Sequence, residues 1–101
     1  MDEIAQAFAA IVEKVNAMPE GAGKEDAKEA AMKLEAEARK GEEADEGRAR
    51  RWFDFLAETS ADAWEVAVTT FANPIAGVGK AFQKIAEKAK EDKKAKSAEK
   101  K

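Results

Sequence analysis

The chain has 101 residues, 39% of them charged, with a formal net charge of −3 and neither cysteine nor histidine. This composition excludes disulfides, thiol nucleophiles, histidine general bases and zinc sites made of Cys or of Cys and His. Alanine, glutamate and lysine are abundant and only two prolines occur, so one small domain of helices with polar outer faces is expected.

Two helices are predicted at the start of the chain, over residues 2–17 and 24–40, with a loop containing proline and glycine between them. The stripe of the second helix consists of small residues around Leu34, so a neighbouring helix has to approach it closely. Gly41 is the predicted end of this helix, and an acidic connector follows over 41–47. The first helix has one apolar stripe with spacings of four, three and four, formed by Ile4, Phe8, Ile11 and Val15.

The third helix is predicted over residues 48–58, with Trp52, Phe55 and Leu56 on one face. Phe53 lies off that face, and we expect it either to be partly exposed or to reach a second neighbour.

The fourth helix is predicted over residues 61–72. The sequence from Thr59 to Asp62 matches a capping box that would open this helix. Its β-branched residues also allow a strand, but the helical spacing of the apolar side chains favours a helix. Those side chains are Trp64, Ala67, Val68 and Phe71.

Asn73-Pro74 predicts a break followed by a fifth helix that begins at Pro74, because Asn is a good N-cap and Pro a good first helical residue. Gly77 and Gly79 weaken the first turns of this helix and permit close approach of another backbone. An apolar seam with spacings of three, four, three and four follows the break, formed by Ile75, Val78, Phe82, Ile85 and Ala89.

Together these elements predict an all-α fold, a small bundle of four or five helices. A core centred on Trp and Phe residues is expected from the third, fourth and fifth helices. The domain is predicted to cover residues 1–94, and a frayed basic tail to follow over 95–101, where apolar anchors are lacking.

Charge is unevenly distributed along the chain. Residues 80–101 contain nine lysines and four acids, a balance of +5, and residues 1–79 contain nine basic and seventeen acidic residues, a balance of −8. An amphipathic helix with basic residues such as Lys84 and Lys88 can lie on anionic lipid, although acids in the same helix dilute the effect.

Three short patterns suggest chemistry, and each has a simpler explanation. The GVGK of residues 77–80 lacks the preceding Gly and following Ser or Thr of a phosphate-binding loop. The acids of residues 42–46 lack the spacing of a calcium loop and are expected to be a solvated connector. Arg48, Arg50 and Arg51 precede Trp52, as in some nucleic-acid sites, but we expect these arginines to pair with nearby acids. No catalytic residue, metal, cofactor or nucleic-acid partner is therefore expected.

The N-terminus begins with acidic residues and lacks the basic segment of a secretory signal. The longest stretch without a charged residue, 66–79, is shorter than an ordinary transmembrane helix needs. We therefore expect a cytoplasmic chain.

Several segments recur in this order in a known type of bacterial sequence. They are KLEAEARK (33–40), GEE (41–43), RW (51–52), FLA (55–57), DAWEV (62–66), NPIAGVG (73–79) and IAEKAK (85–90). With them the chain resembles an uncharacterised α-helical C-terminal domain, often attached to short Gly/Asp repeat segments in bacterial multidomain proteins. The resemblance implies a helical accessory domain in the company of bacterial signalling or conflict-system proteins, and it carries over no catalytic residues.

The sequence thus favours a non-enzymatic protein-interaction module, an adaptor or oligomerisation domain. An apolar seam longer than a small domain can cover would dock a partner helix or a second copy, with Ile75, Val78, Phe82 and Ile85 as contact candidates. The alternative is a peripheral membrane-binding module that acts through the basic C-terminal helix, with Lys84 and Lys88 as the lipid contacts.

Overall fold

All secondary-structure elements of the described residues are helical. The computed structural model describes residues 3–99, with side chains to Lys93, and within that part of the chain it contains no strand. The all-α prediction is confirmed. The elements are α1 (Glu3–Asn16), α2 (Ala22–Ala38), the 3-10 turn η1 (Gly41–Glu43), α3 (Glu46–Thr59), α4 (Ala61–Phe71) and α5 (Lys80–Glu99).

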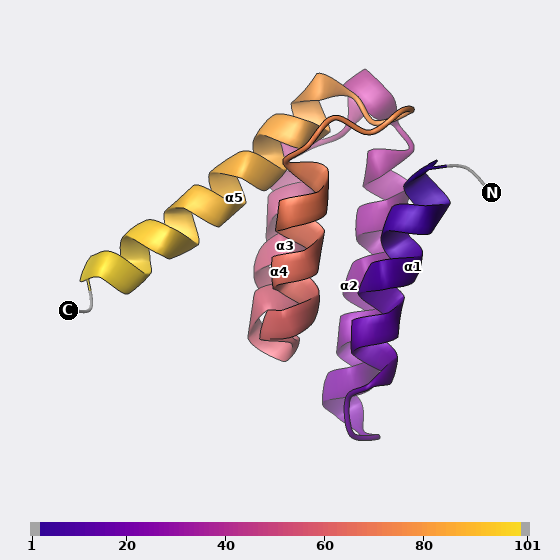
Figure 1. Cartoon of the computed structure of the whole chain (residues 1–101), viewed down its shortest axis with the longest axis vertical. Helices are drawn as coiled ribbons and strands as arrows, with labels where there is room; N and C mark the ends of the chain where they lie inside the picture. Colours follow the sequence, from indigo (N-terminus) through magenta and orange to yellow (C-terminus); the bar gives the residue numbers. More distant parts are fainter. Residues whose placement is uncertain (1–2, 100–101) are drawn as a thin grey trace.

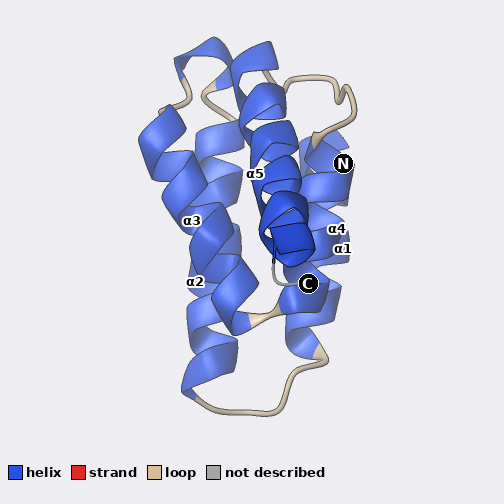
Figure 2. Ribbon diagram, turned by 90° about the vertical axis from the view of Figure 1, so that its left-hand side faces the viewer, coloured by secondary structure: helices blue, strands red, loops and turns tan. Residues whose placement is uncertain are grey.

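Helices α1 to α4 form an antiparallel bundle in which each helix packs against two of the other three (Figure 1). Helices α1 and α4 make the front layer of that view, and α2 and α3 lie behind them. Helix α5 crosses α3 and α4 obliquely and contacts both, on the side away from α1 and α2 (Figure 2). Helix α3 therefore has three helical neighbours: α2, α4 and α5.

The core is built from the apolar stripes that the spacing predicts. All four stripe residues of α1 are buried, and so are the small residues of α2 around Leu34, which lets α1 and α3 approach α2 closely. Four phenylalanines form a continuous chain of rings through the bundle. Their centroids are 4.9 Å apart for Phe8 and Phe71, 5.3 Å for Phe71 and Phe82, and 5.6 Å for Phe82 and Phe53. These rings join α1, α4, α5 and α3 in one core.

Phe53 is fully buried, because α5 covers the side of α3 from which it projects. Of the two expectations for Phe53, contact with a second neighbour is the one confirmed. Trp52 and Phe55 are only half-buried and pack against the edge of the core. The tryptophan of the core is Trp64, which is 9% exposed and has the Lys93 ammonium 4.5 Å from its ring centroid.

The fifth helix begins six residues later than the sequence predicts, at Lys80 rather than at Pro74. Residues 73–79 form a loop because tertiary partners satisfy its backbone. The Ala76 N–H donates to Glu3 Oε2 (2.9 Å), and the Lys80 N–H donates to Glu42 Oε1 (2.9 Å). Glu42 thus caps α5 from outside the helix. The prediction that Asn73 and Pro74 open a helix is wrong, and the seam before Phe82 is not helical.

Two glycines let this loop pack where it does. Gly77 has a φ of +90°, a conformation that favours glycine. A Cβ on Gly79 would lie 2.5 Å from the carbonyl carbon of Gly41 and 2.7 Å from the Glu42 nitrogen. The backbone of Gly79, just before α5, therefore packs directly against the backbone of η1. The predicted close approach of another backbone at Gly79 is confirmed.

Side-chain caps explain the starts of α3 and α4. Asp45 accepts a hydrogen bond from the Arg48 N–H (2.8 Å), so α3 begins at Glu46, earlier than predicted. Ser60, rather than Thr59, is the N-cap of α4 and accepts from the Ala63 N–H (3.2 Å).

Part of the predicted tail over residues 95–101 belongs to the last helix. Helix α5 extends to Glu99, residues 100 and 101 lie outside the described residues, and the division at residue 94 stays a prediction.

A buried carboxylate holds the corner between α2 and α3. Glu37 is 2% exposed and accepts hydrogen bonds from Lys40 Nζ (2.9 Å) and from the Asp45 N–H (3.1 Å), and Arg48 lies 3.6 Å away. Burial by itself raises the pKa of Glu37. The two hydrogen bonds and the charges of Lys40 and Arg48 outweigh it, so the pKa is lower than its ordinary value of 4.5.

Gly79→Ala tests the backbone contact with η1. The added methyl group forces the loop away from Gly41, so we expect the free energy of unfolding to fall by about 1–3 kcal/mol in urea titrations. Gly23→Ala is the matched control, because a Cβ there meets nothing within 4 Å and its position is helical. The control is expected to gain about 0.5 kcal/mol. Equal stabilities for the two variants would contradict the role of Gly79.

Glu37→Gln tests the buried carboxylate. The folded-state pKa of Glu37 is lowered, so its contribution to stability is present at neutral pH and is lost as the pH falls through that pKa, below 4.5. We expect the variant to be less stable by about 1–3 kcal/mol at neutral pH. The gap should narrow in unfolding curves recorded at acid pH. Glu29→Gln, an exposed position on α2, controls for the substitution. A pH-independent gap would refute the assignment.

Candidate functional site

The predicted contact residues of the seam do not form one exposed surface. Phe82 is fully buried and Ile85 is 5% exposed, and both belong to the core. Ile75 and Val78 lie in the loop before α5, half-buried against the core. The seam of α5 is thus covered by its own chain, since α3 and α4 lie against it. A contact between a partner and the outer edges of Ile75 or Val78 stays a prediction.

The basic row of α5 faces acidic side chains of the same chain. Lys84 and Lys88 are exposed, and with Lys80 they line a shallow groove whose other wall includes Glu42 and Glu46. The two carboxylates lower the positive potential of this row at close range. Among the described residues, no helix is both long enough and apolar enough to cross a bilayer.

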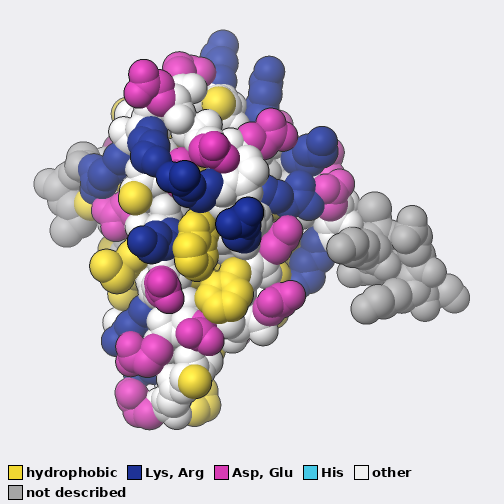
Figure 3. Space-filling view, turned by 180° about the vertical axis from the view of Figure 1, so that it is seen from behind, with side chains coloured by type: hydrophobic (Ala, Val, Ile, Leu, Met, Phe, Trp, Pro, Cys, Tyr) yellow, Lys and Arg dark blue, Asp and Glu magenta, His cyan; other side chains and the backbone are white. Residues whose placement is uncertain are grey.

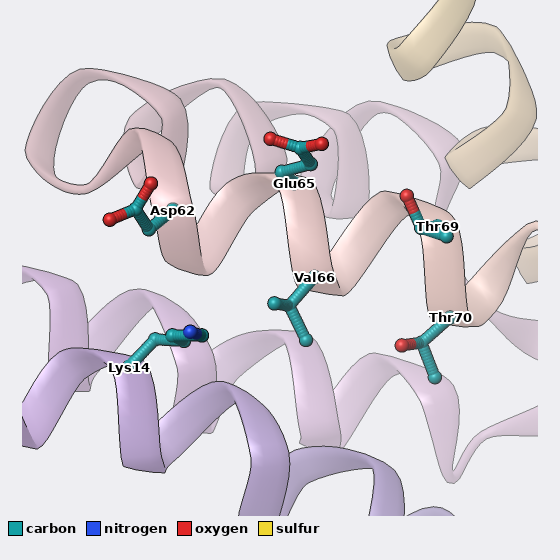
Figure 4. Close-up of a pocket in the computed structure, with 6 residues that line it drawn as sticks. All are labelled: Lys14, Asp62, Glu65, Val66, Thr69 and Thr70. Carbon is teal, nitrogen blue, oxygen red and sulfur yellow. The ribbon is translucent and has the colours of Figure 1, made fainter.

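A second groove runs between α1 and α4 (Figure 4). Asp62 and Glu65 project from α4 on its outer side, and Lys14 projects from α1 below them. Val66, Thr69 and Thr70 complete the lining. The groove is open and its charged side chains are exposed to solvent. Within the described part of the chain, no three acidic side chains converge on a point where a metal ion could bind.

The outward side of α3 differs from both grooves, because it carries large aromatic side chains beside arginines. Arg48, Arg51, Trp52 and Phe55 are spaced at i, i+3, i+4 and i+7, which places them in one row along the helix. We call these four residues the α3 outer stripe. The two rings meet edge to face, with centroids 5.8 Å apart. Figure 3 shows the molecule from the α2 and α3 side, with apolar side chains at the centre of this face among charged ones.

The arginines around Trp52 have different surroundings, which the sequence does not distinguish. Arg50 pairs with Asp92 of α5 (2.6 Å) and with Asp54 (3.3 Å), and it borders the same shallow hollow as Arg51 and Phe55. Arg48 keeps a side chain that is 59% exposed beside Glu37. Pairing with nearby acids is therefore confirmed for Arg50 and, loosely, for Arg48.

Sequence reasoning missed the α3 outer stripe because it assigned Trp52 and Phe55 to the core. The helical spacing of the small and large apolar residues of α3 could have revealed it. The fully buried residues Ala49, Phe53 and Leu56 recur at four and three, and they define a buried arc that leaves Trp52 and Phe55 on its flank.

Comparison with known proteins places the chain in a family. The sequence model of the family described as ternary complex associated domain 2 matches residues 5–92, a range that runs from α1 to the Arg50 partner on α5. No curated protein and no solved structure matches. The match confirms the resemblance to a helical domain family, while the bacterial, multidomain setting stays an expectation. The chain belongs to the ternary complex associated domain 2 family.

Proposed function

We propose that this chain is a non-enzymatic, helical protein-interaction module that takes part in a multi-component protein assembly. The observation that carries the proposal is the Trp52–Phe55 pair, which leaves two large aromatic rings half-exposed on the outside of α3. The description of its family, ternary complex associated, supports the same function. We place the module, as an adaptor, in the cytoplasm of a bacterium, a reducing compartment that suits a chain without cysteine.

The core does not need the outer faces of these two rings. Four other phenylalanines and Trp64 already fill the space between α1, α3, α4 and α5. An aromatic side chain that is half-covered by its own chain is already partly ordered, so a partner gains buried apolar area at low entropic cost. Trp and Arg, side by side here, are among the residues that contribute most to binding at protein interfaces.

The non-enzymatic part of the proposal rests on what the polar groups of the grooves already do. The charged side chains that line both grooves described above are mostly solvent-exposed, where water competes for every contact. The buried carboxylate, Glu37, is engaged by Lys40, the Asp45 backbone and Arg48 at a structural corner. A carboxyl that acts as a general acid needs a raised pKa, whereas the pKa of Glu37 is lowered. A nucleophilic carboxylate needs to be free in a shaped cleft, whereas Glu37 is buried and engaged.

Affinity purification from the cell of origin tests the proposal. We expect the tagged chain to retain a reproducible set of proteins, and the double variant Trp52→Ala, Phe55→Ala to lose most of it, by about tenfold or more in recovered amount. Met32→Ala is the matched control, since Met32 is a 69% exposed apolar side chain on α2. Circular dichroism melts confirm that each variant folds. The same proteins at the same yield on the folded double variant would refute the proposal.

Membrane association through α5 is the second candidate, and the packing of α5 counts against it. An amphipathic helix lies on a bilayer with its apolar face in the lipid. In α5 that face is buried, with Phe82 against Phe53 and Phe71. The basic residues that would contact lipid, Lys84 and Lys88, share their groove with Glu42 and Glu46.

We therefore expect the purified chain not to float with anionic phosphatidylserine-containing vesicles, even at low salt, where lipid electrostatics are strongest. A chain with Lys84→Glu and Lys88→Glu should behave identically in the same flotation assay. Salt-sensitive flotation that these two substitutions abolish would instead make α5 the functional element.

A further inference from the structure

We propose that the partner segment bound by the α3 outer stripe is an acidic peptide that also carries at least one large apolar side chain. This inference rests on the proposed function and names the chemistry of the partner. The occupant is a segment of another protein, with carboxylates next to Arg48 and Arg51 and its apolar side chain against Trp52 and Phe55.

The geometry of the stripe divides it into a basic end and an aromatic end. Arg48 and Arg51 lie toward the η1 end of α3, and Trp52 and Phe55 follow one turn later on the same side. From residue 48 to residue 55 the helix rises by roughly 10 Å, about two turns. That span matches the side chains that one short peptide segment presents, with a carboxylate at one end and an apolar group at the other.

The dipole of α3 does not favour positive charge at this end of the helix. The N-terminus of a helix carries a partial positive charge, so an arginine in its first turn, such as Arg48, is an unfavourable neighbour. Asp45 and Glu46 offset part of that effect. The remaining arginine donors are available to a carboxylate of a partner. That carboxylate would add hydrogen bonds and would also offset the unfavourable interaction between the arginine charge and the helix dipole.

Arg48 and Arg51 are less engaged by acids of their own chain than Arg50 is. Arg50 is held between Asp92 at 2.6 Å and Asp54 at 3.3 Å. Arg48 has Glu37 at 3.6 Å, and that carboxylate already accepts shorter hydrogen bonds from Lys40 and from the Asp45 backbone. Arg51 is exposed and lines a shallow hollow together with Phe55. The guanidinium groups of Arg48 and Arg51 can therefore bind a carboxylate in the bidentate way that suits it.

The acids near the stripe set the direction and the class of the partner. Asp54 and Glu58 line the same hollow as Arg51 and Phe55 and lie toward the far end of α3. They repel a long polyanion that follows the helix, so the surface suits a peptide with a few carboxylates better than a nucleic-acid strand. Carboxylates of the peptide are thus expected only directly beside Arg48 and Arg51. Neutral or basic residues are expected near Glu58 and near the exposed acids Asp45 and Glu46.

The experiment is a selection from a display library of random short peptides on the purified full-length chain, run in parallel on the variant Arg48→Glu, Arg51→Glu. We expect the unmodified chain to enrich peptides with Asp or Glu beside Leu, Ile, Phe or Trp. The charge-reversed variant is expected to enrich Lys or Arg in place of the acids. Such an exchange of preference cannot come from a folding defect, and circular dichroism melts check each variant.

The best peptide is then synthesised and its Kd measured by fluorescence anisotropy at low and high salt. We expect weaker binding at high salt, and a Kd raised about tenfold or more by the double charge reversal and by Phe55→Ala. The control Lys14→Glu, Lys33→Glu changes the net charge equally at exposed sites on α1 and α2, and should leave the Kd unchanged.

Three outcomes would overturn the inference. Enriched peptides without acids that still require Phe55 would refute the acidic partner and leave the interaction module standing. A labelled oligo-dT strand that binds more tightly than the best peptide, and is lost on charge reversal, would assign the surface to nucleic acid. No enrichment by either chain would refute the inference, and the proposed function would then be judged by co-purification alone.

Discussion

Gly79 lies so close to the backbone of Gly41 that a single methyl group would push the two segments apart. This contact closes one end of the bundle, where the start of α1, η1 and the start of α5 meet. Glu3 and Glu42 secure the meeting point by accepting hydrogen bonds from the Ala76 and Lys80 backbones. These contacts hold the loop of residues 73–79 in one position, and the loop determines where α5 begins and in which direction α5 runs away from the end of the bundle.

The direction of α5 decides what α3 buries. Because α5 crosses α3 and α4 on one side, Phe53 and Phe82 meet at 5.6 Å and complete the line of rings that begins at Phe8. Helix α3 then has α2, α4 and α5 as neighbours, and its remaining outward arc carries Trp52 and Phe55. The surface proposed for partner binding is thus exposed because the contact between residues 73–79 and η1 sets the direction of α5.

Charge reinforces this division between core and surface. Glu37, buried at the corner of α2 and α3, holds Lys40 and the Asp45 backbone and sits beside Arg48, which keeps the first turn of α3 in place. On the opposite flank, Arg50 joins α3 to α5 through Asp92. Arg50 thus links two helices, whereas the exposed guanidinium groups of Arg48 and Arg51 lie at the surface, where an acidic segment can reach them.

The sequence by itself determined the helices, because apolar spacing is a local property of the chain. The stripe from Ile4 to Val15, the small-residue face around Leu34 and the stripe from Trp64 to Phe71 are all buried as their spacing predicts. Only the tertiary structure decided the loop of residues 73–79, since its backbone partners, Glu3 and Glu42, are distant in sequence. It also decided which aromatic residues of α3 are buried: an apolar face has no partner until neighbouring helices are placed, and α5 covers Phe53 and leaves Trp52 and Phe55 at the edge.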